Sequence, residues 1–363
     1  MTVWEWIDDF AARARSAGDR ERLRLTGVLG EAYEYRHTNP DRMLALFAEG
    51  RRLALALEEP WWVLFFDYWH VETLIYYQED YRTLLDAAVK LTVDVHRPAF
   101  VQHPLRLPIA ANLIAAYLCI DPHGYADEIR GALDYALCEG MPHDGVLYLF
   151  LFRQEWFAWE MGRLDEARAV CERIVGLAES DPEPHRALHH LVGAHVCLCR
   201  IAHRRRDWDG LDLWARAGEE LAQRRGGRYE KALCVLWRAV WARHEGMDAD
   251  ARRLCRAGTA QMARLGRLPD EVYFDALCQF HELGGELENA LTARERQRSI
   301  VADRGQLATE CLNALHRCRL LTMMGRPLEE ACGHVRAAAA RLRRPAYYLD
   351  KLDRLLSGDL DLP

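Results

Sequence analysis

Apolar residues recur along this chain at the spacing of a helix face, and the clearest case lies between Trp156 and Pro182. After Gly162 the apolar residues fall at positions i, i+3, i+4, i+7, i+8 and i+11: Ala167, Val170, Cys171, Ile174, Val175 and Ala178. This spacing places them along one side of an α-helix. Gly162 is typical of a tight turn before that helix, and Pro182 cannot continue it. The stretch therefore predicts a helical hairpin with one apolar side, which needs a neighbour to bury that side.

The same pattern of helix, turn and helix recurs along the chain. The residue five positions after each turn, or six in the last unit, is small or aliphatic: Leu44, Leu84, Ile129, Ala167, Leu211, Ala251, Ala290 and Ala331. These anchors are 40, 45, 38, 44, 40, 39 and 41 residues apart. A repeat of this period indicates an α-solenoid, in which neighbouring hairpins share one continuous core. We therefore expect an all-α protein built from about eight helical hairpins.

The regular hairpins extend over residues 39–342. Residues 1–38 are expected to form N-terminal capping helices, and residues 343–363 a C-terminal capping helix and tail, because the ends of a repeat stack need covering. Three prolines interrupt the pattern between residues 98 and 108, so this link is the expected flexible point. No segment alternates polar and apolar residues over a useful length, and we expect no sheet.

The hairpin units resemble the tetratricopeptide repeat. A turn glycine is followed five residues later by alanine in three units: Gly162 and Ala167, Gly246 and Ala251, Gly285 and Ala290. Asp181 and Pro182 stand where that family often has its inter-repeat proline. The units depart from the family in being nearer 40 residues long than its usual 34 or so. Such long, divergent repeats are similar to those of bacterial peptide-receptor regulators and of the sensor arms of signalling ATPases.

The resemblance implies a right-handed superhelix whose concave groove is lined by the first helix of each hairpin. It places ten candidate peptide-binding residues in that groove: Phe66, Trp69, Tyr76, Phe152, Trp156, Trp159, Arg200, His203, Arg243 and Arg319. Aromatic walls suit large apolar side chains, and the guanidinium of arginine suits carboxylates. We therefore expect a protein or peptide ligand with apolar and acidic anchors. The alternative is that these aromatic rings belong to the core and the arginines are solvated.

Composition narrows the classes of function. The net charge of −7 argues against a nucleic-acid-binding protein. No secretory signal and no apolar run long enough to cross a bilayer is visible, which predicts a cytoplasmic protein without a membrane partner. The chain also lacks the phosphate-binding loop, the nucleophile elbow and the zinc-protease motif. We therefore expect no catalysis and no cofactor.

The eleven cysteines favour a structural role. Cys199, Cys278 and Cys318 each lie seven residues before a turn, at a position that Ala239 shares, and cysteine packs there as a small apolar residue. No CxxC pair occurs. His195, Cys199 and His203 are spaced to lie on one helix face and are the candidates for a metal site, but no fourth ligand completes a zinc set.

The leading expectation is a non-catalytic scaffold or regulator that binds a protein or peptide. One alternative is a regulatory receptor whose superhelix changes conformation on a small peptide. A second is a metal-dependent enzyme on a helical scaffold. A third is a protein that self-associates, because exposed aromatic residues can mediate a homodimer.

Overall fold

The computed structural model describes residues 2–35, 38–78, 80–81, 83–138, 145–180, 184–225, 227–265 and 270–360. Throughout these residues every regular element is a helix and no strand occurs, so the prediction of an all-α protein is confirmed. The helices gather into two compact units. Unit 1 comprises Met1–Ile120 with Asp127–Gly140, and unit 2 comprises Asp121–Ala126 with Met141–Pro363.

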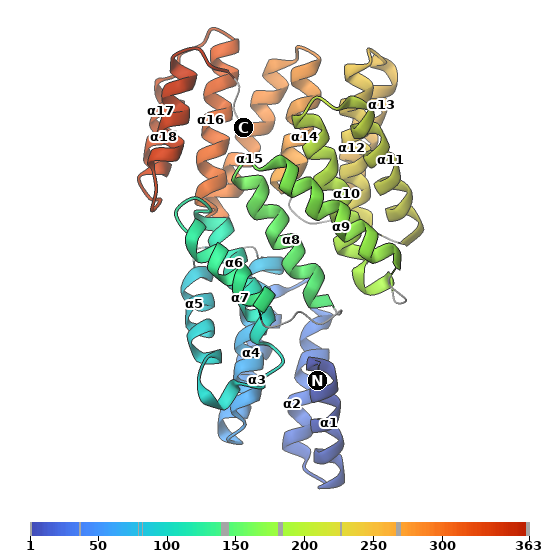
Figure 1. Ribbon diagram of the computed structural model, residues 1–363, viewed down its shortest axis with the longest axis vertical. Helices are drawn as coiled ribbons and strands as arrows, with labels where there is room; N and C mark the ends of the chain where they lie inside the picture. Colours follow the sequence, from blue (N-terminus) through green and yellow to red (C-terminus); the bar gives the residue numbers. More distant parts are fainter. Residues whose placement is uncertain are drawn as a thin grey trace. The chain divides into compact units, whose positions relative to one another are not determined.

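Unit 1 holds the first seven α-helices, a π-helix and a 3₁₀-helix (Figure 1): α1 (Val3–Ser16), α2 (Arg20–Glu34), α3 (Pro40–Ala56), α4 (Pro60–Thr73), η1 (Leu74–Gln78), α5 (Leu84–Val95), η2 (Pro98–Phe100), α6 (Arg106–Ile120) and α7 (Ala126–Cys138). The aromatic helix α4 supplies the centre of its core. Trp62 and Phe66 are buried, and the Trp62 ring packs on Trp6 and Phe10 of α1 at 4.8 and 5.1 Å between centroids.

The proline-rich link between α5 and α6 packs into the core of unit 1, to which it belongs. Phe100, His103 and Leu105 are buried, and the His103 Nε2 lies 3.2 Å from the carbonyl oxygen of Trp61. Burial lowers the pKa of His103 to about 4, so its ring is neutral at physiological pH. The residues expected to bend therefore contribute to the core of this unit.

Unit 2 holds eleven α-helices: α8 (Gly145–Glu160), α9 (Leu164–Ser180), α10 (Pro184–Arg204), α11 (Trp208–Arg225), α12 (Arg228–His244), α13 (Asp248–Ala263), α14 (Glu271–Leu283), α15 (Leu287–Arg304), α16 (Leu307–Met323), α17 (Glu329–Ala339) and α18 (Ala346–Leu356). Each even-numbered helix from α8 to α16 packs on the odd-numbered helix that follows it. In addition, α10 packs on both α8 and α12, α12 on α14, and α16 on α18. Helix α9 ends at Ser180, and the helix breaker Pro182 lies outside the described residues.

The turns between these paired helices share one geometry. Gly162, Gly246, Gly285 and Gly325 have φ between 65° and 72°, a conformation that glycine adopts without a steric penalty. The residue after each glycine donates its N–H to the carbonyl five residues earlier, as Arg163 does to Ala158 at 2.8 Å. The predicted turn glycines therefore close the first helix of each pair.

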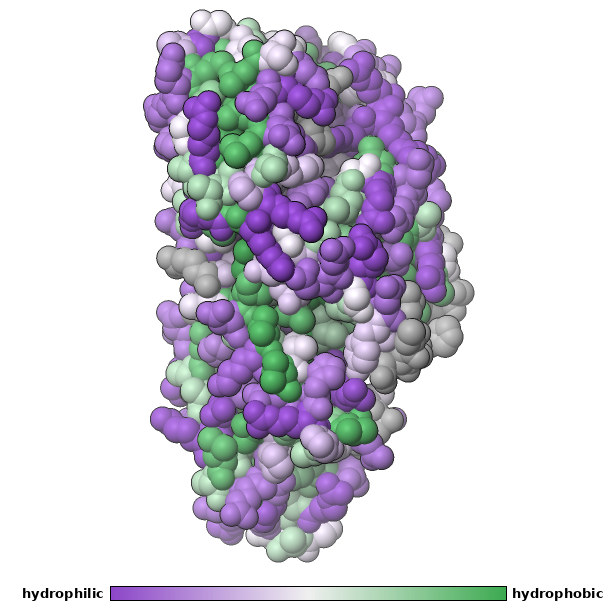
Figure 2. Space-filling view, turned by 60° about the vertical axis from the view of Figure 1, so that its left-hand side comes forward, coloured by the Kyte–Doolittle hydropathy of each residue, from purple (hydrophilic) through white to green (hydrophobic). Residues whose placement is uncertain are grey.

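Seven of the eight anchor residues are buried, and Leu44 is partly buried. Cys199, Cys278 and Cys318 are fully buried, as expected of small packing residues. Hydrophilic residues cover most of the face shown in Figure 2, with the hydrophobic ones in narrow strips between them. None of the described helices is both long and apolar enough to cross a lipid bilayer.

Polar contacts also join residues about one repeat apart in the sequence. Four arginine–carboxylate pairs are separated by 40, 43, 37 and 38 residues: Arg205 with Asp165, Arg243 with Glu286, Arg319 with Glu282, and Arg326 with Glu288. Because each pair joins neighbouring helix pairs, these contacts fix the register of one against the next.

Candidate functional site

The three candidate groove residues in unit 1 differ in accessibility. Phe66 is 1% exposed and belongs to the core. Trp69 is partly buried, and its ring stacks on Phe47 with centroids 6.1 Å apart. Tyr76 lies in the π-helix and is 39% exposed. Of these three side chains, Tyr76 has the surface that a ligand could contact.

The aromatic candidates of unit 2 lie on α8 and are partly buried. Phe152 packs near His190, with ring centroids 5.9 Å apart. Trp156 donates its indole N–H to Glu160 Oε1 at 3.3 Å. Trp159 carries the guanidinium of Arg200 over its ring at 4.3 Å from the centroid, a cation–π contact between α8 and α10. The structure therefore brings together Trp159 and Arg200, two residues that the sequence predicted for one groove.

Arg200 is already paired with carboxylates of the chain. Its Nη2 lies 3.4 Å from Asp275 Oδ2 and 3.9 Å from Glu271 Oε1 on α14, and its side chain is largely buried. Thr309 of α16 donates its hydroxyl to Glu271 at 3.0 Å, which holds that carboxylate in place. The charge of Arg200 is thus balanced without a ligand.

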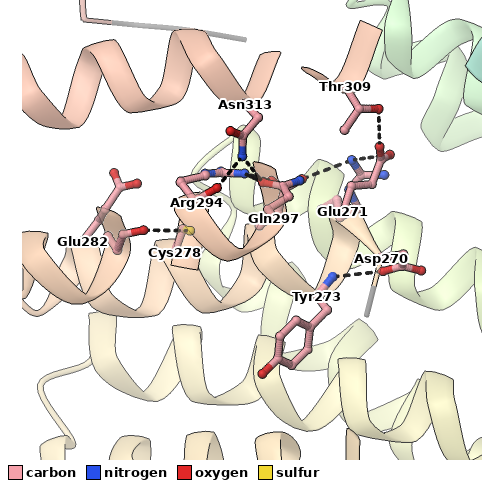
Figure 3. A network of polar contacts seen from close by, with 12 residues as sticks. Asp270, Glu271, Tyr273, Cys278, Glu282, Arg294, Gln297, Thr309 and Asn313 are labelled. Atoms are coloured by element: carbon pink, nitrogen blue, oxygen red, sulfur yellow. Dashed lines mark hydrogen bonds and ion pairs between the residues drawn. The ribbon is translucent and has the colours of Figure 1, made fainter. Parts of the chain in front are cut away.

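A buried network extends from the same carboxylates (Figure 3). Arg294 Nη1 donates to Asp275 Oδ1 and to Gln297 Oε1, both at 2.8 Å. Asn313 of α16 donates from Nδ2 to Gln297 Oε1 at 2.7 Å. The network joins α14, α15 and α16, and two of its buried atoms, Arg294 Nε and Asn313 Oδ1, have no hydrogen-bond partner.

The two other candidate arginines are paired in the same way. Arg243, whose side chain is 4% exposed, donates to Asp248 Oδ1 at 2.8 Å and also to Glu286. Arg319 is paired with Glu282. An acidic ligand would have to displace a carboxylate of the chain to reach either arginine.

His203 is held between aromatic rings. Its ring centroid lies 5.5 Å from those of Trp208 and Trp237. Burial lowers its pKa to about 4, so it is neutral at physiological pH. This histidine packs between α10, α11 and α12 as an uncharged ring.

Two cations of unit 2 form no salt bridge in the part of the chain that the structure describes, although the carboxyl group of Glu160 acts electrostatically on both and that of Asp275 on Arg204. Lys351 of α18 is buried, its Nζ has no hydrogen-bond partner, and that atom lies 4.4 Å from the centroid of the Tyr347 ring. Arg204, the last residue of α10, lies over Trp159 at 5.7 Å. Burial and the nearby Arg204 lower the pKa of Lys351 to about 7.

Glu160, the last residue of α8, belongs to the same cluster. Burial and the neighbouring carboxylate of Glu271 raise its pKa to about 8, so it is mostly protonated at neutral pH. When Glu160 is ionised its charge acts on Lys351 and Tyr347, and the charge of Arg204 acts on the same two residues. We call Trp159, Glu160, Arg204, Tyr347 and Lys351 the Trp159–Lys351 cluster.

Both carboxylates and cations surround this cluster: Asp275 acts on Arg204, and Glu271 acts on Glu160. His316 of α16 is placed near Arg294, Arg319, Arg204 and Lys351, and burial together with these cations lowers its pKa well below the usual value. With His316 neutral and Glu160 protonated, the cluster carries net positive charge at neutral pH. It is therefore suited to an anionic ligand group.

Sequence reasoning named one member of this cluster, Trp159, and missed the other four. Glu160 follows Trp156 by one helical turn, and Arg204 follows Arg200 in the same way, so continuing the predicted faces by a turn would have found both. Tyr347 and Lys351 lie on α18, which was expected only to cap the repeats. No pattern in the sequence indicates that α18 lies near α8.

The predicted metal candidates do not form a site among the described side chains. His195 is buried, and its Nδ1 lies 2.8 Å from the carbonyl oxygen of Leu191. Cys199 packs in the core beside Cys234, and His203 lies between tryptophan rings. The group of three metal-ligating side chains that the structure brings together is instead Glu155, Cys171 and Cys197.

Comparison with known proteins identifies no relative of this chain. No protein-family model, no curated protein and no solved structure matches the chain.

Proposed function

We propose that this chain is a non-catalytic binding protein of the tetratricopeptide-like kind, with about eight hairpins stacked as a right-handed superhelix. The shared turn geometry, the anchors and the ion pairs one repeat apart support this architecture. In such a superhelix the even-numbered helices α8 to α18 would form the inner face of unit 2. The partner is a segment of another protein, bound on that face.

The observation that carries the proposal is a pair of cations without a salt bridge beside two aromatic rings. Among the described residues Arg204 and Lys351 form no salt bridge, Lys351 Nζ has no hydrogen-bond partner, and the two cations lie against Trp159 and Tyr347. A buried charge without a partner is costly, so a ligand carboxylate that reaches Lys351 would relieve that cost. His123 stacks on Tyr347 with centroids 3.4 Å apart and Arg200 lies over Trp159, so an apolar side chain of the ligand would pack against the edges of these rings.

These contacts specify the peptide more narrowly than the sequence did. The acidic anchor pairs with Arg204 and Lys351, because Arg200, Arg243 and Arg319 are paired with carboxylates of the chain. We therefore expect a segment with an acidic residue, or a free C-terminal carboxylate, beside an aromatic or large aliphatic residue. The described cysteines are free thiols, which supports the proposed cytoplasmic location.

A random peptide library displayed on phage tests this function. We expect selected peptides to share an acidic residue next to an apolar one and to bind the purified chain in a fluorescence anisotropy assay. Combining Arg204→Gln with Lys351→Met should weaken that binding at least ~10-fold, about 1.4 kcal/mol. The matched control joins Arg253→Gln to Lys231→Met, two cations of unit 2 outside the cluster.

Either of two results would contradict this assignment. One is selection of peptides without acidic residues. The other is equal affinity of both double variants for the selected peptides, while circular dichroism shows both to be folded.

A second candidate is a peptide-sensing regulator, the same site coupled to a change of conformation. The make-up of the cluster favours this candidate, because its residues come from both ends of unit 2 in the sequence. Helix α8 lies near the start of that unit, and α18 is its last helix. A ligand that joins Lys351 to the end of α8 would bias the distance between them. Small-angle X-ray scattering with and without a selected peptide distinguishes the two: an unchanged radius of gyration favours a rigid scaffold.

A further inference from the structure

Three potential metal ligands meet between three consecutive helices of unit 2. Glu155 comes from α8, Cys171 from α9 and Cys197 from α10. One carboxylate oxygen and the two sulfur atoms all lie within 4.8 Å of one another. The residues are only 3%, 0% and 8% exposed. Cys171 follows Glu155 by 16 residues and Cys197 follows Cys171 by 26, so no short sequence motif contains all three.

Glu155 is the unusual member of the group. It stands seven residues before its turn, where the next units have Cys199, Ala239 and Cys278. It forms no salt bridge within the described part of the chain; its carboxyl group is hydrogen-bonded with the Cys197 thiol and is acted on electrostatically by Arg200. Packing explains a cysteine or an alanine at this position, but it gives no reason for a glutamate.

We propose that Glu155, Cys171 and Cys197 bind a zinc ion. Thiolates and a carboxylate are ligands that Zn²⁺ accepts, at about 2.3 Å for sulfur and about 2.0–2.2 Å for oxygen. A tetrahedral ion at these distances sets its ligands roughly 3.5–4 Å apart, which the present separations reach with small side-chain movements. A water molecule would complete the four ligands.

The charges around the group are compatible with zinc. Two thiolates and one carboxylate around Zn²⁺ leave one net negative charge. Arg200, which is paired with Asp275 and Glu271, also lies close enough to act electrostatically on both Glu155 and Cys197 and so lowers the cost of that negative charge. Because the ion would join α8, α9 and α10, its role is structural, and it would fix the helix that carries Trp156 and Trp159.

Metal titration of the full chain tests the proposal. After removal of metals with a chelator, addition of Zn²⁺ alone should give one tightly bound ion per chain by mass spectrometric metal analysis. Co²⁺ in its place should show the charge-transfer absorption of thiolate ligands. Binding should also raise the thermal unfolding temperature, because a ligand of the folded state stabilises it.

Variants identify the ligands. Joining Cys171→Ala to Cys197→Ala should abolish Zn²⁺ binding, and Glu155→Gln should weaken it at least ~10-fold, since the amide is uncharged. Cys199→Ala is the matched control: it is a buried cysteine of the same helix α10 outside the group, and it should bind Zn²⁺ like the unchanged chain. If the double variant does not fold, Glu155→Gln read by the Co²⁺ absorption replaces it.

Two outcomes would overturn the site. One is no Zn²⁺ or Co²⁺ bound at micromolar concentration by the reduced, folded chain. The other is binding that Glu155→Gln and the cysteine variants leave unchanged.

Discussion

Among single side chains, the pairing of each cation decides whether it can act on a ligand. Arg200 and Arg243 carry the charge that the sequence suggested, yet each is neutralised by a carboxylate of the chain. Lys351 and Arg204 form no salt bridge among the described residues, although the carboxyl group of Glu160 acts on both. Burial also lowers the pKa of Lys351 to about 7, so the charge of this side chain depends on pH near neutrality.

Binding of an acidic peptide should therefore weaken as the pH rises. The pKa of Lys351 is lowered to about 7, so its ammonium form is present below that pH and is lost above it. The pKa of Glu160 is raised to about 8, so a negative charge appears in the cluster as the pH passes that value. Both changes disfavour an anion, and we expect affinity to fall about 10-fold between pH 6 and 9.

Two variants separate these contributions in the same anisotropy assay. Lys351→Arg keeps its charge throughout and should lose much of the pH dependence, as should Glu160→Gln. Arg204 and Arg354, the other cations that act on Lys351, keep their charge over this range. Affinity that is constant or rises between pH 6 and 9 would contradict the placement of the acidic anchor.

Between helices, close packing and repeat-spaced ion pairs hold the elements together. Gly50 of α3 faces the Phe66 ring of α4, and a Cβ there would lie 2.5 Å from Phe66 Cζ. Arg243 joins the end of α12 to Glu286 at the start of α15. Each contact belongs to a different unit, so each tests the packing of its own unit.

Gly50→Ala should destabilise the chain by about 1–3 kcal/mol, because the added methyl group forces the aromatic ring to move. Gly27→Ala, at an exposed helical position where a Cβ meets no neighbour, should instead be neutral or stabilise by up to about 1 kcal/mol. Urea unfolding measures both. Equal effects of the two substitutions would show that α3 and α4 do not pack as described.

Arg243→Met should cost about 3 kcal/mol of unfolding free energy, because it removes one partner of a buried ion pair. The control is Arg253→Met, which removes an exposed arginine paired with Asp250 and should cost less than about 1 kcal/mol. The same urea experiment compares them. A smaller loss for Arg243→Met than for Arg253→Met would contradict the buried pairing.

These elements show how far the sequence predicts this structure. Local signals predict the helices and their turns, because Gly162 and Ala167 act within one helix pair. The partners of the arginines depend on contacts between helix pairs, which helix periodicity does not describe. Oppositely charged residues about 40 apart, such as Arg205 and Asp165, were nevertheless a readable signal of those contacts. The nearness of α18 to α8 depends on the accumulated rotation of the intervening helices, which no local pattern specifies.

For the chain as a whole, two surfaces are candidates for the proposed peptide-binding site. One is the Trp159–Lys351 cluster of unit 2. The other is a cavity of about 510 Å³ in unit 1, between α3, α4 and α5, lined by apolar residues such as Val63 and Phe100 and by charged ones such as Lys90. Two of the charged residues that line this cavity, Arg51 and Asp67, are paired with each other, with 2.6 Å between Arg51 Nε and Asp67 Oδ1. Lys351, whose buried Nζ has no hydrogen-bond partner, favours the cluster.

Hydrogen–deuterium exchange of the full chain, with and without a selected acidic peptide, distinguishes these surfaces most directly. The account predicts added protection in α8, α10 and α18, and none in α3 to α5. Protection confined to α3, α4 and α5, or no change in α18, would contradict the assignment of peptide binding to the even-numbered helices of unit 2.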